Sequence, residues 1–321
     1  MDKPLIYITR KMPEKLLEPY ESIVRFDMWE DEHAPVPREV LLEKAKQADG
    51  IVCMLTEQID QELLEQAQQL KIVANMAVGY DNIDIEAAKQ KQIMVTNTPD
   101  VLTETTADLT FALLMATARR LIEASDYIRD DKWGPWSPFQ LAGADVHHKT
   151  IGIVGMGRIG EAVVKRAKGF GMSVLYYNRS RKYKAEETLG AVYTDFDTLL
   201  EKADFVVSLV PLTAETRHVF NEQAFQKMKK SAIFINASRG GTMDERALYK
   251  ALEEKEITAA GLDVFEKEPI RSDHPLVNLD NVVCLPHIGS ASMETRVGMF
   301  NLCLDNVALF FDGDKPKTPV I

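Results

Sequence analysis

The chain has 321 residues and a formal net charge of −11, and 45% of its residues are hydrophobic and 27% charged. This length accommodates two domains with sizeable cores, and the composition is that of a soluble globular protein. The acidic balance argues against a nucleic-acid partner, which would need clustered cations, and no apolar run reaches the roughly 18 residues of a membrane span.

The first hundred residues alternate short apolar runs with helical segments. This alternation predicts βα units on a parallel sheet. We expect strands at Leu5–Thr9, Gly50–Leu55, Lys71–Met76 and Ile93–Asn97, with helices such as Glu39–Gln47 and Gln61–Gln68 between them.

A longer helix is predicted next, over Thr103–Ser125, because Leu109, Leu113 and Ala118 recur on one helical face. Residues 131–149 then break every period with Gly, Pro and Trp, so we interpret them as a loop or arm. Two tryptophans exposed on such an arm favour burial against a second subunit.

A second alternating series begins at Thr150 and predicts a doubly wound dinucleotide-binding fold of six strands. A last helix is expected over Ser292–Phe311, and it could pack back on the first domain, which would make that domain discontinuous. The six strands are expected at Ile151–Val154, Ser173–Tyr177, Phe205–Leu209, Ala232–Asn236, Ala259–Val264 and Val282–Leu285.

The three cysteines, Cys53, Cys284 and Cys303, lie far apart without CxxC spacing. Cys53 and Cys284 fall inside apolar runs and are interpreted as small buried hydrophobic residues. We therefore expect a reducing cytoplasm and assign no metal ligands. The N-terminal sequence MDKPLIYITR lacks the apolar segment of a signal peptide, so none is expected.

A glycine-rich turn at residues 155–160, Gly-Met-Gly-Arg-Ile-Gly, matches GxGxxG. It follows an apolar strand and opens a helix predicted over Ile159–Phe170, the context in which this pattern indicates dinucleotide binding. Gly155 would make the tight turn, Gly157 would let the backbone approach a pyrophosphate, and Gly160 would allow close helix–strand packing. The N-terminus of the helix would present its amides to the anion.

The end of the second strand decides which dinucleotide fits. NAD sites place an acidic residue there to hold the ribose 2′-hydroxyl, but this chain has Asn178 followed by Arg179, Ser180 and Arg181. The two guanidinium groups can pair with a 2′-phosphate and the hydroxyl of Ser180 can donate to it. We therefore predict NADP(H) as the preferred cofactor, with NAD(H) as the alternative.

Three polar residues follow strands of the predicted second sheet: Arg239 in INASRGG, Glu268 in DVFEKEP and His287 in LPHIGS. The carboxyl ends of parallel strands form the ligand crevice of such a sheet. An arginine, a carboxylate and an imidazole meeting there can orient an anionic substrate and move a proton.

These stretches resemble the D-isomer-specific 2-hydroxyacid dehydrogenases. The matching segments are AVGYDNID (77–84), TTADLTFALLMATARR (105–120), GIVGMGRIG (152–160), SLVPLTAETRH (208–218), FINASRGG (234–241), GLDVFEKEP (261–269) and LPHIGSAS (285–292). The arm and the NRSR segment resemble the glyoxylate/hydroxypyruvate reductase branch, which includes 2-ketogluconate reductases. The resemblance implies an enzyme that reduces a 2-keto acid (glyoxylate, hydroxypyruvate or 2-ketogluconate) to the D-2-hydroxy acid.

The resemblance also implies two doubly wound α/β domains and a homodimer. A Rossmann cofactor domain, residues 100–288, would be inserted into a discontinuous flavodoxin-like substrate domain, residues 1–99 plus 289–321.

The family's roles transfer to matching residues. Arg239 would anchor the substrate, His287 would exchange the proton at the carbonyl oxygen, and Glu268 would pair with His287, favouring the imidazolium and fixing its tautomer. Besides Arg239 and His287, the implied substrate contacts are Leu55, Val78, Gly79 and Ser290. Besides the glycine turn and residues 178–181, the implied cofactor contacts are Thr106, Arg158, Ile159, Val210, Pro211, Thr216, Ala237, Ser238, Asp263 and Gly289.

A regulatory function is the main alternative. Some relatives of this fold act as dinucleotide-sensing transcriptional corepressors without significant turnover. Such a role usually comes with long disordered flanks, which this sequence does not show, and the chain keeps Arg, Glu and His at the catalytic positions. The sequence therefore favours the enzyme.

Overall fold

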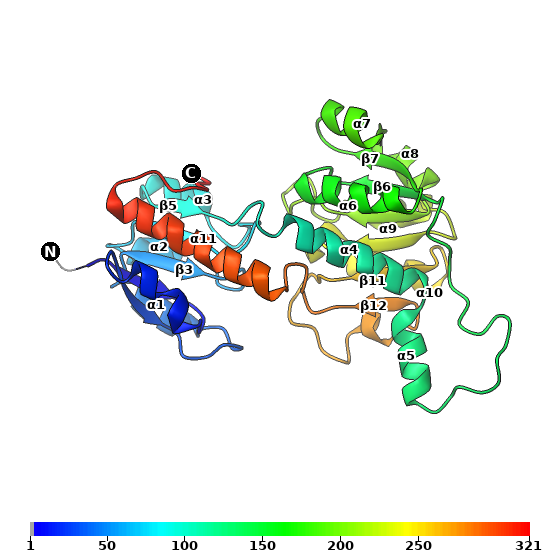
Figure 1. The fold of residues 1–321 in the computed structure, drawn as a ribbon, viewed down its shortest axis with the longest axis horizontal. Helices are drawn as coiled ribbons and strands as arrows, with labels where there is room; N and C mark the ends of the chain where they lie inside the picture. Colours follow the sequence, from blue (N-terminus) through cyan, green and yellow to red (C-terminus); the bar gives the residue numbers. More distant parts are fainter. Residues whose placement is uncertain (1–2) are drawn as a thin grey trace. The chain divides into compact units, whose positions relative to one another are not determined.

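The computed structural model describes residues 3–321. The chain divides into two compact units (Figure 1). Unit 1 contains the described residues up to Leu102 together with Ser292–Ile321, and unit 2 is Thr103–Ala291. Unit 2 is thus inserted between two segments of unit 1, which are distant in the sequence.

Unit 1 is built on a five-stranded sheet with the order β2-β1-β3-β4-β5. All neighbouring strands are parallel, which gives the flavodoxin-like order 2-1-3-4-5. The strands are β1 (Leu5–Ile8), β2 (Arg25–Met28), β3 (Gly50–Cys53), β4 (Ile72–Asn75) and β5 (Met94–Thr96). The helices are α1 (Arg38–Ala45), α2 (Gln61–Gln66), α3 (Ile85–Gln90) and α11 (Met293–Asp312).

One strand of this sheet was not expected from the sequence. β2 reads Arg-Phe-Asp-Met and forms the edge of the sheet, where one side of the ladder has no partner strand. None of its residues is fully buried, so it lacks the continuous apolar run that marks β3 and β4. The predicted last helix is confirmed as α11, which Ser292 caps by accepting from the amide of Thr295.

Unit 2 is built on a seven-stranded parallel sheet with the order β12-β11-β10-β9-β6-β7-β8. Counted from its first strand, this is the dinucleotide-binding order 3-2-1-4-5-6 with a seventh strand added. The strands are β6 (Thr150–Val154), β7 (Ser173–Tyr177), β8 (Val192–Tyr193), β9 (Phe205–Ser208), β10 (Ile233–Asn236), β11 (Ala259–Leu262) and β12 (Val282–Cys284). The helices are α4 (Thr103–Ala118), α5 (Leu121–Arg129), α6 (Arg158–Gly169), α7 (Tyr183–Leu189), α8 (Phe196–Lys202), α9 (Glu222–Lys227) and α10 (Glu245–Glu253).

The prediction of six strands is therefore wrong by one. The missed strand, β8, has only two residues, and Val192 is exposed. A strand of two residues at a sheet edge is too short to show an alternation of apolar and polar residues in the sequence. It nevertheless completes the three-strand half of the doubly wound sheet.

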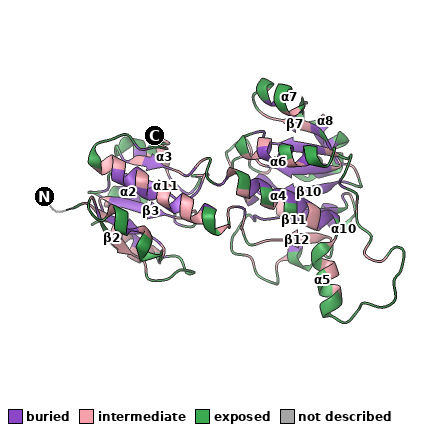
Figure 2. Cartoon of the chain, in the orientation of Figure 1, coloured by how far each residue is buried: buried purple, intermediate pink, exposed green. Residues whose placement is uncertain are grey.

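Helices cover both faces of the unit 2 sheet and bury two separate cores. One core joins α4 and α6 to the sheet through residues such as Leu114 and Val163, and the other lies under α8, α9 and α10 around Phe225 and Leu248. The central strands β9, β10 and β11 are buried along their whole length (Figure 2). Polar functional residues can therefore be reached by solvent only beyond the ends of these strands.

The prediction of one helix over Thr103–Ser125 is also wrong, because α4 ends at Ala118 and α5 starts at Leu121. Arg120 lies between them in the left-handed region, with φ 53°. The carbonyl of Ala118 accepts from the amide of Ala144 instead of continuing the helix. The chain returning from the arm thus closes the helix end, a long-range contact that no local pattern reveals.

The arm that follows α5 is a loop, as expected. Trp133 is 67% exposed, Trp136 82% and Phe139 86%. In Figure 1 this segment extends away from the rest of unit 2. Leu121 and Ile128 of α5 add further exposed apolar surface beside it.

Candidate active site

The glycine turn joins β6 to α6, and two of its glycines are required by packing. Gly155 has φ 105°, and a Cβ there would lie 2.6 Å from the carbonyl carbon of Leu209. A Cβ on Gly160 would lie 2.6 Å from the carbonyl oxygen of Gly155. A Cβ on Gly157 would instead meet nothing within 4 Å. Gly157 therefore leaves open space beside the start of α6.

This open space is suited to an anion. Gly157 is the N-cap of α6 and has no side chain to accept from the amides of the first turn, at Arg158, Ile159 and Gly160. A helix N-terminus carries partial positive charge and directs amides outward. The residues of the turn thus fit the pyrophosphate of a dinucleotide cofactor.

The two arginines in the segment after β7 differ in their contacts. Arg181 makes two hydrogen bonds of 2.7 Å to the carboxylate of Glu186, and its guanidinium lies over the rings of Tyr183 and Tyr193. The hydrogen bonds from Arg181, and then from Tyr176, lower the pKa of Glu186 to about 2. Both arginines are exposed, but Arg181 is bound to Glu186, whereas Arg179 makes no hydrogen bond or ion pair within residues 3–321. Asn178 turns its side-chain amide to the carbonyl of Ser180, at 3.0 Å.

The other predicted cofactor residues of unit 2 form three groups. Thr106 of α4, Asp263 and Gly289 lie together, because a Cβ on Gly289 would lie 3.2 Å from Oδ2 of Asp263 and 3.4 Å from Cγ2 of Thr106. Val210, Pro211 and Thr216 follow β9, where the Thr216 hydroxyl donates to the carbonyl of Pro211 at 2.6 Å. Ala237 and Ser238 directly follow β10, and Ser290 follows Gly289 beyond β12.

The three predicted catalytic residues follow three neighbouring strands: Arg239 comes after β10, Glu268 after β11 and His287 after β12. Nδ1 of His287 lies 2.7 Å from Oε2 of Glu268. The second oxygen of Glu268 accepts from the amide of Phe265 at 2.9 Å. The side chains of His287 and Glu268 are 23% and 29% exposed, so the pair is fixed and still accessible.

Packing brings Arg239 to the same place. A Cβ on Gly240 would lie 1.8 Å from the carbonyl carbon of Phe265, so the chain after Arg239 crosses directly against the chain that leads to Glu268. The carbonyl of Arg239 accepts from the Thr242 hydroxyl at 2.7 Å and from the Asn236 side chain at 3.2 Å. The backbone at Arg239 is therefore held in place, and Nη1 of its guanidinium donates to the carbonyl of Ser238 at 3.0 Å.

The charges of these groups act on each other. Burial alone would raise the pKa of Glu268, but the hydrogen bond and charge of His287, with a smaller contribution from Arg239, lower it. Glu268 is thus held as a carboxylate. Burial raises the pKa of Asp263, which is 1% exposed and accepts from the amide of Ile288 at 2.8 Å. Asp263 therefore fixes the backbone next to His287.

The predicted substrate residues of unit 1 follow the ends of two of its strands. Leu55 comes after β3, and Val78 and Gly79 come after β4. They lie in two loops, residues 54–57 and 76–82, which we call the Glu57 loop and the carboxylate loop. Side chains of unit 1 that the sequence analysis did not select, among them Asn75, Asn82, Asn97 and Glu57, hydrogen-bond these loops. Asn75 ends β4 and Asn97 directly follows β5, so a polar residue at the end of a buried strand was the only signal that these two gave.

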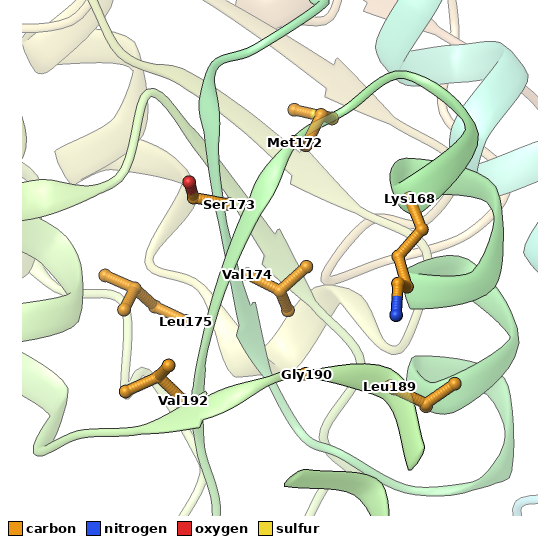
Figure 3. Close-up of a pocket in the computed structure, with 8 residues that line it drawn as sticks. All are labelled: Lys168, Met172, Ser173, Val174, Leu175, Leu189, Gly190 and Val192. Atoms are coloured by element: carbon orange, nitrogen blue, oxygen red, sulfur yellow. The ribbon is translucent and has the colours of Figure 1, made fainter. Parts of the chain in front are cut away.

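A cavity of about 280 Å³ lies elsewhere in unit 2 (Figure 3). Its lining includes Lys168, Ser173 and Gly190. Ser173 begins β7, whereas the cofactor residues follow the other end of that strand. The cavity is thus separate from the chemistry described above.

Comparisons with known proteins identify the family of this chain. The family model for the D-isomer specific 2-hydroxyacid dehydrogenase NAD binding domain matches residues 111–289. A glyoxylate reductase from Korarchaeum cryptofilum is 51% identical over 319 residues, which cover 99% of this chain and 96% of that protein. The chain belongs to the D-isomer specific 2-hydroxyacid dehydrogenase family.

Solved structures also resemble the chain over nearly its whole length. A protein from Thermus thermophilus is 40% identical with a TM-score of 0.92, over 99% of this chain and 100% of the other. An NADPH-dependent glyoxylate/hydroxypyruvate reductase from Sinorhizobium meliloti, solved with NADP and malonate, is 34% identical with a TM-score of 0.85, over 99% and 97%.

The chain is therefore an NAD(P)-dependent oxidoreductase that acts on a CH–OH group. The predicted fold class, with a Rossmann domain and a second parallel-sheet domain, is confirmed. Within residues 3–321, no helix combines the length and apolar character needed to cross a membrane.

Proposed function

We propose that this dehydrogenase reduces glyoxylate and similar small 2-keto acids, such as hydroxypyruvate or 2-ketogluconate, to the D-2-hydroxy acid with NADPH. The observation that carries the proposal is the His287–Glu268 pair with Arg239 at the ends of β10, β11 and β12. The glyoxylate reductases that are about half identical to this chain support the substrate class.

When bound, the nicotinamide supplies a hydride, which goes to the carbonyl carbon of the substrate. His287 donates a proton to the carbonyl oxygen, and it takes the proton back in the reverse reaction. Glu268 keeps Nδ1 of His287 protonated, so Nε2 is the nitrogen that exchanges the proton. Arg239 binds the carboxylate and carbonyl oxygens of the substrate with its planar guanidinium.

The carboxylate of the substrate also binds to the backbone amides of Val78 and Gly79, and Leu55 and Ser290 contact the rest of it. Unit 1 is accordingly the substrate domain and unit 2 the cofactor domain. For the cofactor, Arg158, Ile159 and Gly160 bind the pyrophosphate, and Asp263 binds the nicotinamide amide.

Arg179 supplies most of the preference for NADP(H), since Arg181 is already paired with Glu186. The Sinorhizobium relative, which is NADPH-dependent and was solved with NADP, supports this cofactor. The exposed apolar side chains of the arm and of α5 support a homodimer. The three free cysteines support a reducing cytoplasm.

A panel of 2-keto acids with two, three and six carbons, assayed with NADPH and with NADH, tests the proposal. We expect the highest kcat/KM for a small 2-keto acid with NADPH. Absence of turnover with every member would contradict the proposal and favour the dinucleotide-sensing alternative. Higher kcat/KM with NADH would reject only the cofactor preference.

A further inference from the structure

Three consecutive carbonyls of the carboxylate loop are each held by a different donor. The carbonyl of Ala77 accepts from the amide of Thr98 at 2.9 Å. The carbonyl of Val78 accepts from Nδ2 of Asn97 at 2.8 Å, and the carbonyl of Gly79 accepts from Nδ2 of Asn75 at 2.9 Å. Two of the three donors are side-chain amides at the ends of β4 and β5.

These anchors also fix the amides of the loop. In a trans peptide, the N–H points opposite to the C=O of the same peptide group, and the peptides of this loop are trans. The bond from Asn97 to the Val78 carbonyl therefore directs the N–H of Gly79 away from the anchoring strand ends. The bond from Asn75 to the Gly79 carbonyl does the same for the N–H of Tyr80. Among residues 3–321, the amides of Val78, Gly79 and Tyr80 have no acceptor.

The two anchoring residues are themselves held, Asn97 through its backbone and Asn75 through its side chain. The backbone N–H of Asn97 donates to the carbonyl of Thr318, and the Thr318 hydroxyl donates back to the backbone carbonyl of Asn97 at 2.6 Å. Thr318 is paired in turn with Asn306, which is fully buried on α11. Asn75 is also fully buried, and its Nδ2 bonds Oδ1 of Asn82 at 3.2 Å.

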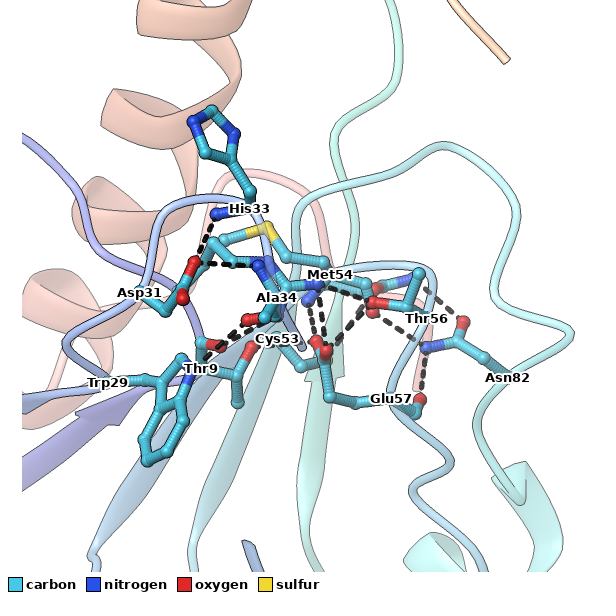
Figure 4. Close-up of polar contacts among 12 residues, drawn as sticks. Thr9, Trp29, Asp31, His33, Ala34, Cys53, Met54, Thr56, Glu57 and Asn82 are labelled. Atoms are coloured by element: carbon cyan, nitrogen blue, oxygen red, sulfur yellow. Dashed lines mark hydrogen bonds and ion pairs between the residues drawn. The ribbon is translucent and has the colours of Figure 1, made fainter. Parts of the chain in front are cut away.

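Asn82 connects the carboxylate loop to the Glu57 loop. Its Nδ2 donates to the carbonyls of Met54 and Glu57, at 3.1 and 3.0 Å. Glu57 is 3% exposed, and its carboxylate accepts from the Thr9 hydroxyl and the Met54 amide, at 2.7 and 2.8 Å (Figure 4). The two loops that carry Leu55, Val78 and Gly79 thus form one hydrogen-bonded assembly.

We propose that Asn97 and Asn75 are positioning residues for substrate binding. By holding the carbonyl of Val78, Asn97 keeps the N–H group of Gly79 oriented for the carboxylate of the 2-keto acid, and Asn75 supports it by holding the next peptide of the loop through the carbonyl of Gly79. Donors that are oriented in advance need no reorganisation when the anion binds. This inference rests on the proposed function, because it assumes that the loop binds the substrate carboxylate.

Asn97→Ala is the main test, because it releases the peptide that carries the Gly79 amide and leaves the backbone anchor at Thr98 in place. We expect the KM of the 2-keto acid to rise about 10-fold, the scale of one hydrogen bond to a charged group. The Kd of oxamate, an unreactive 2-keto acid analogue, should rise equally. The KM of NADPH should not change, and kcat should change less than the substrate KM.

Thr96→Val is the matched control. Thr96 lies next to Asn97, and its hydroxyl is buried without a hydrogen-bond partner, so its loss should change neither KM. Asn75→Ala gives an independent variant, and Asn97→Ser replaces Asn97→Ala should the latter not fold. In wild-type protein labelled with ¹⁵N-glycine, oxamate should shift the Gly79 amide resonance, and this shift should shrink in the Asn97 variant.

The outcomes separate the inference from the proposed function. Normal turnover by the wild type, together with an unchanged oxamate Kd in Asn97→Ala, would overturn the inference and leave the function standing. A parallel loss of kcat, NADPH affinity and melting temperature would also overturn it, because it would show a purely structural role. Absence of turnover and of oxamate binding in the wild type would overturn both.

Discussion

In the proposed function, both units place functional groups at the carboxyl ends of parallel strands, but they use different parts of the chain. Unit 2 presents charged side chains, Arg239, Glu268 and His287. Unit 1 presents backbone amides, and neutral asparagines hold them in position. Residue type reveals the first kind of site, because few side chains can move a proton at neutral pH. It does not reveal the second kind, because every residue except proline has an amide.

Two carboxylates illustrate the same difference. Glu57 of unit 1 is almost fully buried, pairs with Arg10 at 3.3 Å and accepts from the protein at both oxygens. Glu268 of unit 2 pairs with His287 and remains partly exposed. Burial by itself would select Glu57 as the functional residue. Of these two pairs, His287–Glu268 is the more accessible, and access to the paired groups is the better criterion for chemistry.

The largest effect should come from the proton donor of unit 2. His287→Gln keeps a polar side chain of similar length but cannot exchange a proton, so we expect kcat to fall by about 10²–10⁴-fold. The Kd of NADPH, measured by fluorescence titration, should stay near the wild-type value. A fall in kcat of less than tenfold would show that another group donates the proton. Unit 2 would then no longer be the unit that acts through its charged side chains.

The glycine turn offers a test in which affinity and stability respond separately. Gly157→Val fills open space at a residue with φ −90°, so the fold should tolerate it. The added side chain occupies the volume proposed for the pyrophosphate, and we expect the Kd of NADPH to rise about 10²-fold, the loss of about two charge-assisted hydrogen bonds.

Gly160→Ala is the matched variant, because its Cβ would lie 2.6 Å from the Gly155 carbonyl oxygen. Overpacking of this kind should lower the free energy of unfolding by about 1–3 kcal/mol. Thermal unfolding and cofactor titration of both variants check the separation. A lower melting temperature for Gly157→Val than for Gly160→Ala would contradict it.

The sequence predicted most of the fold, and the charged residues that it selected in unit 2, Arg239, Glu268 and His287, follow neighbouring strands. Strands such as β9 and β10 are buried along their length and are apolar without interruption, so local pattern identifies them. β2, β8 and the break at Arg120 depend on edge pairing or on a contact from a distant residue, which no window of the sequence contains. The asparagine anchors escaped prediction for the same reason, because Asn97 acquires its role only through contact with Val78.

A smaller effect is expected from the two arginines after β7, which should contribute unequally to the cofactor preference. Arg179→Asp should lower the ratio of kcat/KM for NADPH over NADH by about 10-fold, because a carboxylate repels the 2′-phosphate that the exposed guanidinium would bind. Arg181→Ala should change that ratio less, because the guanidinium of Arg181 is already bound to Glu186. Steady-state kinetics with both cofactors measure the ratio. Equal effects of the two substitutions, or no change with Arg179→Asp, would remove the distinction.

The smallest effect should be a change in acid stability at Glu268. Its pKa in the folded chain lies below the ordinary 4.5, so the ionised carboxylate stabilises the fold above pH 4.5, and this contribution is lost as the pH falls through the lowered value. Glu268→Gln lacks the contribution. Its free energy of unfolding should therefore be lower than that of the wild type by about 1 kcal/mol or less at pH 6, and the difference should shrink towards pH 3. Urea unfolding at several pH values measures it, with Glu187→Gln, an exposed position on α7, as the control. A difference that grows as the pH falls would mean that Glu268 opposes folding in its ionised form, and the pairing with His287 would then have to be maintained by the rest of unit 2.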